Sequence, residues 1–327
     1  MTKLPAHQGA SNNVGPTGAK MRKNNEYYTP LSVIQNELVH YDKKQFKGKI
    51  VYCNCDDYRT SNFVSYFKTN FHELGLKELI ATHYVPFDMF SSEVANKYTY
   101  NGLQEVVSPL SGDGDFRSEE CLSILKASDI IVTNPPFSIF KQHIDTIMTN
   151  NKLFLTIGNV MAVRLDGVFE YIKCDRIRIG FNYNCKVRFI VPDDAVRYEG
   201  FNEDGSKYSK ACSINWFTNL TLTDLKPERI YPKTYHPDIY PFFDGTNIIS
   251  VPGYEWTPND YPGLMGVPIT ILNNFSHDDI EVFYIYQPQL NGVNLYDRVV
   301  MRWKKPIKVS HAQFSGRVFT QSIFDCE

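Results

Sequence analysis

Apolar runs alternate with segments of helical periodicity along the first half of the chain. Short runs rich in β-branched and aromatic residues, which are typical of buried strands, lie at residues 49–55, 78–84, 127–133 and 152–158. Apolar positions at helical spacing lie between them, at residues 63–67, 118–126 and 139–148. Strands and helices that alternate in this order predict an α/β fold with a parallel sheet.

Two of the predicted strands end abruptly in polar residues. The run Lys49–Cys55 passes into Asp56-Asp57, and the run Ala127–Thr133 passes into Asn134-Pro135-Pro136-Phe137. Proline disfavours both a helix and a strand ladder at this point, so the second loop should be rigid. Open α/β sheets bind ligands outside the carboxyl ends of their strands, and we therefore expect both loops at a binding site. Aspartates before a helix can also be simple caps.

Two further segments carry side chains suited to a pocket. Thr29 and Pro30 precede an apolar-periodic segment, which predicts a helix with Thr29 at the N-cap and Pro30 at the first helical position. Tyr27 and Tyr28 then lie on a rigid lead-in. Residues 112–116 have turn chemistry, in which Asp115 can accept a hydrogen bond and Phe116 can form an apolar wall for an adenine ring. A plain turn is the alternative.

The pattern changes after about residue 160. Strand-like runs at 186–191 and 211–220 predict a hairpin that closes the sheet edge, with the polar segment between them as a surface loop. Beyond about residue 225, Tyr-Pro pairs become frequent and helical periodicity ends. We therefore predict a disordered basic tail over residues 1–24, an α/β domain over 25–225 and a smaller, mostly β region over 226–327.

A net charge of −2 provides no global electrostatic case for nucleic-acid binding, so any such contact must be local. Two basic groups are candidates for phosphate contact: Arg176, Arg178, Lys186 and Arg188 in the first, and Arg302, Lys304 and Lys305 around Trp303 in the second. A solvated face remains the alternative for the first group. An edge strand protected by lysines remains the alternative for the second.

The seven cysteines are scattered and odd in number, which favours a reducing compartment over a disulfide framework. No second Cys or His pair completes a zinc site with Cys53 and Cys55, so we expect no metal. Apolar runs of membrane-spanning length, about 18 residues, do not occur. These features predict a soluble, cytoplasmic protein.

The loop Asn134–Phe137 has the composition by which amino-methyltransferases hold a target nitrogen. An exocyclic amine is a weak nucleophile, since its lone pair is delocalised into the ring. The side-chain carbonyl of Asn134 and the backbone carbonyl of Pro135 can each accept one amine hydrogen, and Pro136 helps to fix their geometry. Phe137 can stack on a base that has left the duplex. RNA adenine and protein glutamine amides remain alternative targets, whereas the absence of a Pro-Cys pair argues against methylation of a cytosine ring carbon.

Taken together, these motifs resemble the adenine-specific DNA methyltransferases of the EcoRI modification type over roughly residues 24–325. The resemblance is carried by Asn25–Thr29, Val51–Asp57, Ser61–Phe63, Leu79–Thr82, Thr133–Phe137, Trp216–Leu220 and Gly266–Thr270. The most distinctive piece is the run Cys53–Asp57, which replaces the glycine-rich loop of most methyltransferases. Tyr58 stands where the family usually has proline, and the strand that ends at Tyr84 lacks the acid that usually binds ribose.

Membership of this family implies a class I S-adenosylmethionine-dependent methyltransferase fold, Rossmann-like with a mostly parallel sheet. It makes residues 25–225 the catalytic domain and residues 226–327 a target-recognition, DNA-binding region. The implied reaction is site-specific methyl transfer from S-adenosylmethionine to the N6 amine of a flipped adenine in double-stranded DNA, as in restriction–modification. The catalytic residues would be Asn134, Pro135, Pro136 and Phe137. The cofactor would be held by Tyr27, Tyr28, Thr29, Asn54, Cys55, Asp57, Asp115, Phe116 and Asn134.

Overall fold

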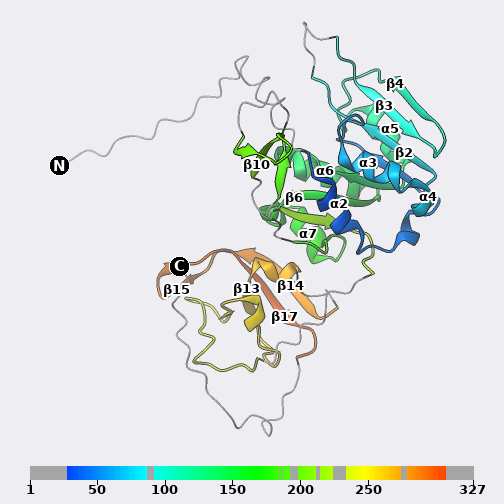
Figure 1. The fold of residues 1–327 in the computed structure, drawn as a ribbon. Helices are drawn as coiled ribbons and strands as arrows, with labels where there is room; N and C mark the ends of the chain where they lie inside the picture. The colour runs from blue at the N-terminus through cyan, green and yellow to red at the C-terminus, as the bar shows by residue number, and fades with distance from the viewer. Residues whose placement is uncertain are drawn as a thin grey trace. The chain divides into compact units, whose positions relative to one another are not determined.

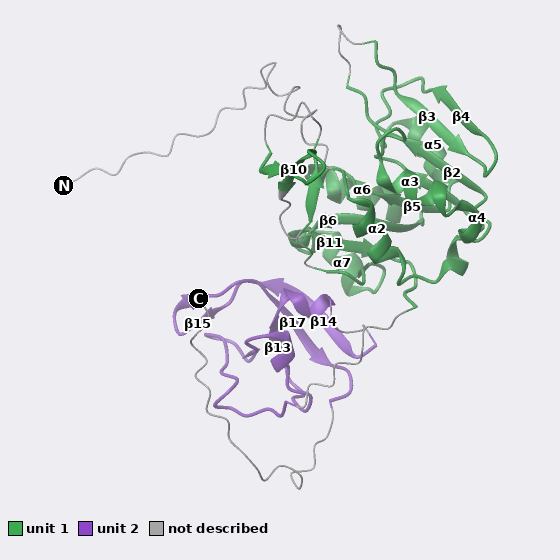
Figure 2. Ribbon diagram, viewed as in Figure 1, with its two compact units in different colours: residues 1–225 green, residues 226–327 purple. Residues whose placement is uncertain are grey.

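The computed structural model describes residues 28–86, 92–183, 185, 187–191, 198–210, 214–223, 233–273 and 278–306. The predicted tail over residues 1–24 therefore lies outside the described residues, as do Tyr27 and Lys186. The chain divides into two compact units, residues 1–225 and 226–327 (Figure 2). This division coincides with the change in sequence pattern near residue 225, while the roles assigned to the two regions stay predictions.

An eight-stranded sheet with the order β4-β3-β2-β1-β5-β6-β11-β7 forms the centre of the first unit (Figure 1). Its strands are β1 (Ile50–Cys53), β2 (Glu78–Thr82), β3 (Asn96–Tyr100), β4 (Glu105–Pro109), β5 (Ile130–Thr133), β6 (Leu153–Asn159), β7 (Arg178–Ile179) and β11 (Ile214–Thr218). Strands β2, β1, β5 and β6 run parallel, which confirms the predicted parallel core.

The description of the sheet as mostly parallel was too strong. Strands β3 and β4 on one side and β11 and β7 on the other are antiparallel to their neighbours. Strands β3 and β4 are joined only by the turn at residues 101–104, and a connection this short permits only antiparallel pairing. Strand β3 lies in a stretch for which the sequence offered no motif.

Helices and 3₁₀ turns connect these strands. They are α2 (Leu31–Leu38), η1 (Lys43–Phe46), α3 (Asn62–Thr69), α4 (Phe71–Leu74), α5 (Glu119–Ala127), η2 (Phe137–Ile139), α6 (Phe140–Thr149), η3 (Val160–Arg164) and α7 (Val168–Lys173). The central strands are covered on both faces, so Val51, Ile130 and Ile131 are fully buried. Among the described residues, no helix is both long and apolar enough to cross a bilayer.

Helix α2 begins one residue later than predicted. Pro30 is at the N-cap, and no side chain caps the helix. The predicted N-cap role of Thr29 is therefore wrong. Its carbonyl instead accepts a hydrogen bond of 2.8 Å from Nδ2 of Asn62, and its side chain is buried. The lead-in is thus attached to helix α3 rather than folded into α2.

Among the described residues, the two segments predicted to form a hairpin are joined by an isolated antiparallel bridge, Cys185 with Ile214, and not by a ladder. The predicted hairpin is therefore wrong in its strand pairing. Strand β8 (Arg188–Ile190) pairs with β10 (Lys207–Lys210), which pairs in turn with β9 (Gly200–Phe201), in a separate antiparallel sheet. Strand β11 pairs with β6 and β7 instead. The polar segment between the two predicted strands is predicted to be a surface loop, but it contains β9 and β10. The turn that joins these two strands is closed by a hydrogen bond of 2.8 Å from the Asn202 N–H to the Ser206 carbonyl, with Gly205 at a φ of +83°.

The second unit is built on a four-stranded sheet with the order β12-β13-β17-β14. Its elements are β12 (Ile249–Ser250), η4 (Tyr254–Trp256), β13 (Met265–Pro268), η5 (Ile269–Asn273), β14 (Ile280–Tyr286), β15 (Gln289–Leu290), β16 (Val293–Asn294) and β17 (Arg298–Trp303). Phe243, Ile248 and Val300 form one cluster of its buried core. Strand β17 pairs on both sides, with β13 and β14, so the basic residues around Trp303 do not mark an edge strand.

The order of the large sheet reverses at β1. This strand pairs with β2 on one side and with β5 on the other, with Val51 opposite Ile130 and Tyr52 opposite Ile131. The carboxyl ends of β1 and β5 are therefore neighbours. A crevice outside such a reversal is where doubly wound folds bind their ligands.

Candidate active site

A cavity of about 820 Å³ lies at the carboxyl ends of β1, β2 and β5. Most of the residues predicted from the sequence to form the site line this cavity: Tyr28, Thr29, Asn54, Cys55, Asp57, Asp115, Phe116, Asn134, Pro135, Pro136 and Phe137. Residues that follow different strands thus converge on one space. Tyr27 lies outside the described residues.

Asp56 lies between the two loops and is buried, with 8% of its surface exposed. The Ser61 hydroxyl donates to its Oδ1 at 2.6 Å, and the Thr133 hydroxyl donates to its Oδ2 at 2.5 Å. The backbone N–H of Asn134 also donates to this carboxylate. Burial raises the pKa of Asp56 to about 6, although the hydrogen bonds act to lower it. Asp56 therefore connects the loop after β1 with the loop after β5.

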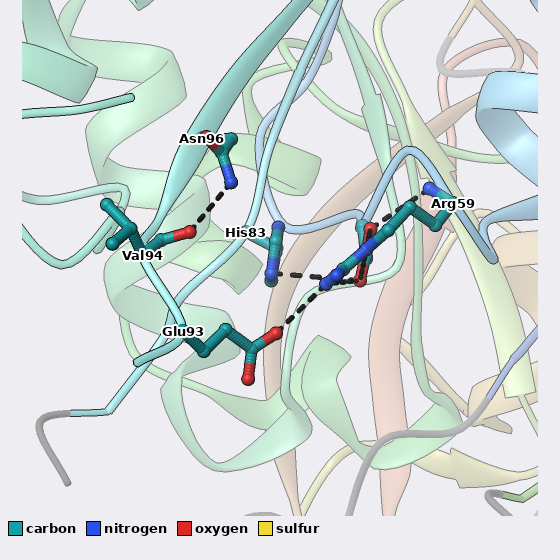
Figure 3. A network of polar contacts seen from close by, with 6 residues as sticks. Arg59, His83, Glu93, Val94 and Asn96 are labelled. Atoms are coloured by element: carbon teal, nitrogen blue, oxygen red, sulfur yellow. Dashed lines mark hydrogen bonds and ion pairs between the residues drawn. The ribbon is translucent and has the colours of Figure 1, made fainter. Parts of the chain in front are cut away.

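Asp57 is held by a different set of contacts. Nε and Nη2 of Arg59 donate to its two oxygens at 2.9 Å and 2.6 Å, and Nη2 also contacts Glu93 at 3.0 Å. Figure 3 shows the side chain of Glu93 directed at the head of Arg59, with the ring of His83 nearby. Nε2 of His83 lies 3.7 Å from Oδ2 of Asp57. Burial acts to raise the pKa of Asp57, but the hydrogen bonds from Arg59 outweigh it, so that pKa lies below its usual value.

Asn54 reaches the cavity from the end of β1 and is buried, with 1% of its surface exposed. Its Oδ1 lies 3.0 Å from Nε2 of His143, on helix α6. Burial lowers the pKa of His143 to about 3, so the ring is neutral at physiological pH. Phe116 packs edge-on against this ring, with centroids 5.2 Å apart. His143 therefore supports both Asn54 and Phe116 from below the cavity.

The turn after β4 is held close to the end of β2. Gly114 has a φ of +78°, and a Cβ on it would lie 2.1 Å from the carbonyl oxygen of His83, so only glycine fits. Asp115 is paired with Arg117, whose Nε donates to Oδ1 at 2.9 Å. These hydrogen bonds lower the pKa of Asp115. The Asp115 carboxylate is therefore ionised, and the guanidinium of Arg117 offsets part of its negative charge.

The loop after β5 is anchored at both ends. The Thr133 carbonyl accepts a hydrogen bond of 2.9 Å from the Thr156 hydroxyl, and the Pro136 carbonyl accepts one of 3.1 Å from the Ile139 N–H. Phe137 is half-buried against the main core and also lines the cavity. The loop is thus fixed by proline geometry and by its neighbours before any ligand binds.

Several cavity residues were not assigned to the site from the sequence. They include Asp56, Ser61, His83, Tyr84 and Arg117. Asp56 had a visible signal, since it belongs to the distinctive run after β1, but nothing in the sequence showed which aspartate of the pair is buried. His83 lies at the end of the second core strand, which lacks the acid that usually binds ribose in this family. The position of His83 at a strand end was the sequence feature that could have indicated a place in the site.

The basic residues predicted to contact phosphate do not line the cavity. Arg178 is paired with Asp175 at 2.6 Å, and Arg302 with Glu281 at 2.7 Å. The others lie on separate elements: Arg176 stacks over Tyr171, Arg188 on β8 stacks over Tyr208, and Lys304 and Lys305 follow β17 and are exposed. Lys186 lies outside the described residues. Within the described ranges, no cluster of His, Cys, Asp and Glu could hold a metal ion.

Comparisons with known proteins agree with the motifs. The chain is 38% identical over 312 residues to Type II methyltransferase M.EcoRI of Escherichia coli, covering 88% of this chain and 95% of that protein. It is 37% identical over 272 residues to Type II methyltransferase M.MgeORF184P of Mycoplasma genitalium, covering 81% and 84%. The same identity over 275 residues relates it to Type II methyltransferase M.MpnI of Mycoplasma pneumoniae, covering 81% and 83%. No solved structure matches the chain significantly.

The match to a family model also extends over most of the chain. Residues 17–317 match the family described as adenine-specific methyltransferase EcoRI, so the match includes both compact units. The family predicted from the loops at residues 53–57 and 133–137 is thereby confirmed. The chain belongs to the EcoRI family of adenine-specific methyltransferases.

Proposed function

We propose that the protein transfers a methyl group from S-adenosylmethionine to the N6 amine of an adenine that has left double-stranded DNA. One observation carries the proposal: the loops Asn54–Asp57 and Asn134–Phe137 line the same cavity. A methyl donor and its acceptor must meet within one enclosed space, and these loops supply groups suited to each. A volume of about 820 Å³ is within the range of cofactor pockets.

The cavity fits S-adenosylmethionine in its polar groups. Three buried cavity residues have side-chain atoms with no hydrogen-bond partner within the described part of the chain: Thr29 Oγ1, Asn54 Nδ2 and both ring nitrogens of His83. Buried polar atoms without partners are rare and call for a ligand or water. The amino-acid end and the ribose of the cofactor offer the required donors and acceptors. When bound, the cofactor supplies an electrophilic methyl group on sulfonium.

The loop after β5 orients the target amine. The side-chain carbonyl of Asn134 and the backbone carbonyl of Pro135 accept the two amine hydrogens. These two hydrogen bonds pyramidalise the nitrogen and take its lone pair out of conjugation with the ring. Phe137 stacks on the face of the base. No covalent nucleophile is required, so the contribution of the chain is mostly positioning, an effect that can supply several kcal/mol of the barrier.

We assign DNA recognition to the second unit. Arg302, Lys304 and Lys305 belong to it, and the last two are exposed. With a net charge of only −2, such local contacts must supply the attraction to phosphate. The relatives are named Type II methyltransferases, and we place this chain likewise in the modification half of a restriction–modification pair.

The test is transfer of labelled methyl groups to unmethylated mixed-sequence duplex DNA, followed by digestion and identification of the labelled nucleoside. We expect N6-methyladenine, and a matched duplex premethylated at every adenine N6 should accept no label. RNA and a glutamine-containing protein serve as parallel acceptors. Label in either of these, with none in DNA, would overturn the proposal.

A further inference from the structure

We propose that Asp56 is a positioning residue that couples the cofactor loop to the target loop. It rests on the proposed function of the cavity, but it concerns a residue to which neither the motifs nor the family match assign a role. Asp56 touches neither ligand in this scheme. It acts through Asn134, whose backbone it holds, and through Thr133, which ends strand β5.

The contacts of Asp56 join three elements. Its own N–H donates to the Thr82 carbonyl of β2 at 3.0 Å. Its carboxylate accepts from Thr133 of β5 at 2.5 Å and from Ser61 at 2.6 Å. Ser61 is the N-cap of α3, where its hydroxyl also accepts from the Phe63 N–H at 3.1 Å. The residue thus contacts the ends of two strands and the start of a helix, and its carboxylate makes the contacts with β5 and with the N-cap of α3.

These contacts continue to both predicted ligands. Toward the cofactor, Asp56 follows Asn54 and Cys55 directly, and Asn62 beside Ser61 holds the carbonyl of Thr29 at 2.8 Å. Toward the target, the N–H of Asn134 donates to Asp56. A shift of the loop after β1 is therefore transmitted to Asn134 through a single carboxylate.

The ionised form of Asp56 is the one that fits. Within the described residues, its carboxylate accepts from the N–H of Asn134 and from the hydroxyls of Ser61 and Thr133. The N–H can only donate, and the Ser61 oxygen already accepts from the N–H groups of Phe63 and Val64, whereas the Thr133 hydroxyl can also accept. A protonated acid donates from one of its oxygens, so protonation reverses or removes one contact and weakens the hold on Asn134 or Thr133. Asparagine keeps only one of the two acceptor oxygens, so it weakens the same contacts.

The decisive variant is Asp56→Asn, with the adjacent Asp57→Asn as a chemically matched control. We expect Asp56→Asn to lower kcat by about 30-fold or more while the Kd for S-adenosylmethionine changes less than about threefold, because misplacing a reacting group affects the chemical step. Asp57→Asn should show the opposite split, with weaker cofactor binding and a smaller change in kcat. A purely structural role for Asp56 would lower the melting temperature and leave this kcat-against-Kd difference absent.

The pH profile of kcat is an independent readout. Asp56 has a pKa of about 6, so kcat of the wild type should fall as the pH drops below about 6, and Asp56→Asn should lack this fall. The titratable groups that interact with Asp56 are Asp57, Cys53 and Cys55. The pKa of Asp57 is lowered and those of both thiols are raised, so none of them titrates near pH 6.

Thr133→Val keeps the proposal testable if Asp56→Asn does not fold. It removes one hydrogen bond that lowers the pKa of Asp56, so the fall in kcat should move to higher pH, and Thr133→Ser should restore the wild-type profile. An unchanged profile in Thr133→Val, or a fall that persists in Asp56→Asn, would overturn the inference. If the wild type methylates no DNA at all, the proposed function fails instead, so the two failures are distinguishable.

Discussion

The cavity and the basic side chains differ in how well the fold gathers them. Residues from the ends of β1 and β5 and from the turn near Asp115 line one space, although Asn54 and Phe137 are 83 positions apart in sequence. Of the basic residues predicted to contact phosphate, those that the structure describes lie on β7, β8 and β17 or beside them, and Arg178 and Arg302 are held in ion pairs. Convergence of the first set is a consequence of the parallel sheet, because neighbouring parallel strands end at the same edge.

This difference separates two kinds of interaction. A methyl transfer needs atoms placed to a fraction of an ångström, and the fold supplies this by anchoring each loop to a strand end. Attraction to a phosphate backbone needs positive charges whose positions are less exact, and the resulting affinity falls as the salt concentration rises. We therefore expect substitutions in the cavity to change rates strongly and substitutions of basic residues to change affinity mildly.

Asn134→Ala should have the largest effect. Removal of the side-chain carbonyl leaves one amine hydrogen unheld, and we expect kcat to fall by about 100-fold or more, as for other groups that act mainly on the transition state. Single-turnover methyl transfer measures this, with circular dichroism to establish folding. Full activity of a folded Asn134→Ala protein would show that the loop does not hold the target.

Phe137→Ala should have the next largest effect. Loss of stacking on a displaced base costs about 1–3 kcal/mol, so the KM for DNA should rise roughly 5- to 150-fold. The Kd for S-adenosylmethionine should be unchanged, and Phe137→Trp should restore much of the affinity for DNA. An equal loss of cofactor affinity would instead assign Phe137 to the cofactor side of the cavity.

Arg59→Ala should reduce stability in a pH-dependent way. The pKa of Asp57 is lowered in the folded state, so its pairing with Arg59 stabilises the protein above the unfolded pKa, and this contribution is lost as the pH falls through the folded value. Arg59 is half exposed, so we expect a loss of less than about 1 kcal/mol at pH 7. Melting temperatures of both proteins from pH 7 downward should converge, and a constant difference would contradict the assignment.

Lys304→Ala should have the smallest effect. Loss of one phosphate contact weakens binding to all sequences alike and lowers the salt slope of DNA affinity by about one. Lys43→Ala, in the first unit and paired with Glu73, removes the same charge and serves as the control. Equal losses in the two variants would show that net charge, rather than a contact in the second unit, governs affinity.

Prediction from sequence was accurate for the parallel core and the cavity loops, and less so for contacts between segments far apart along the chain. The parallel core and the two loops were predictable because a β-branched run that stops at Asn54 or Asn134 leaves few alternatives. The β8–β10 pairing was not, since the hydrophobic pattern near Arg188 specifies a strand without specifying its partner. Nor was the contrast between the adjacent Asp56 and Asp57, because Asp56 is held by Thr133, far along the chain, whereas Asp57 is held by Arg59.

One cavity residue, Cys55, could itself accept the methyl group. A cysteine thiolate is a far stronger nucleophile than an aromatic amine, so a thiolate beside an activated methyl group would be alkylated first. Burial, together with the nearby charge of Asp56, raises the pKa of the Cys55 thiol well above its usual value. The thiol therefore stays protonated at neutral pH. With S-adenosylmethionine bound at the loop after β1, as we propose, the protein keeps a cysteine there without becoming its own methyl acceptor.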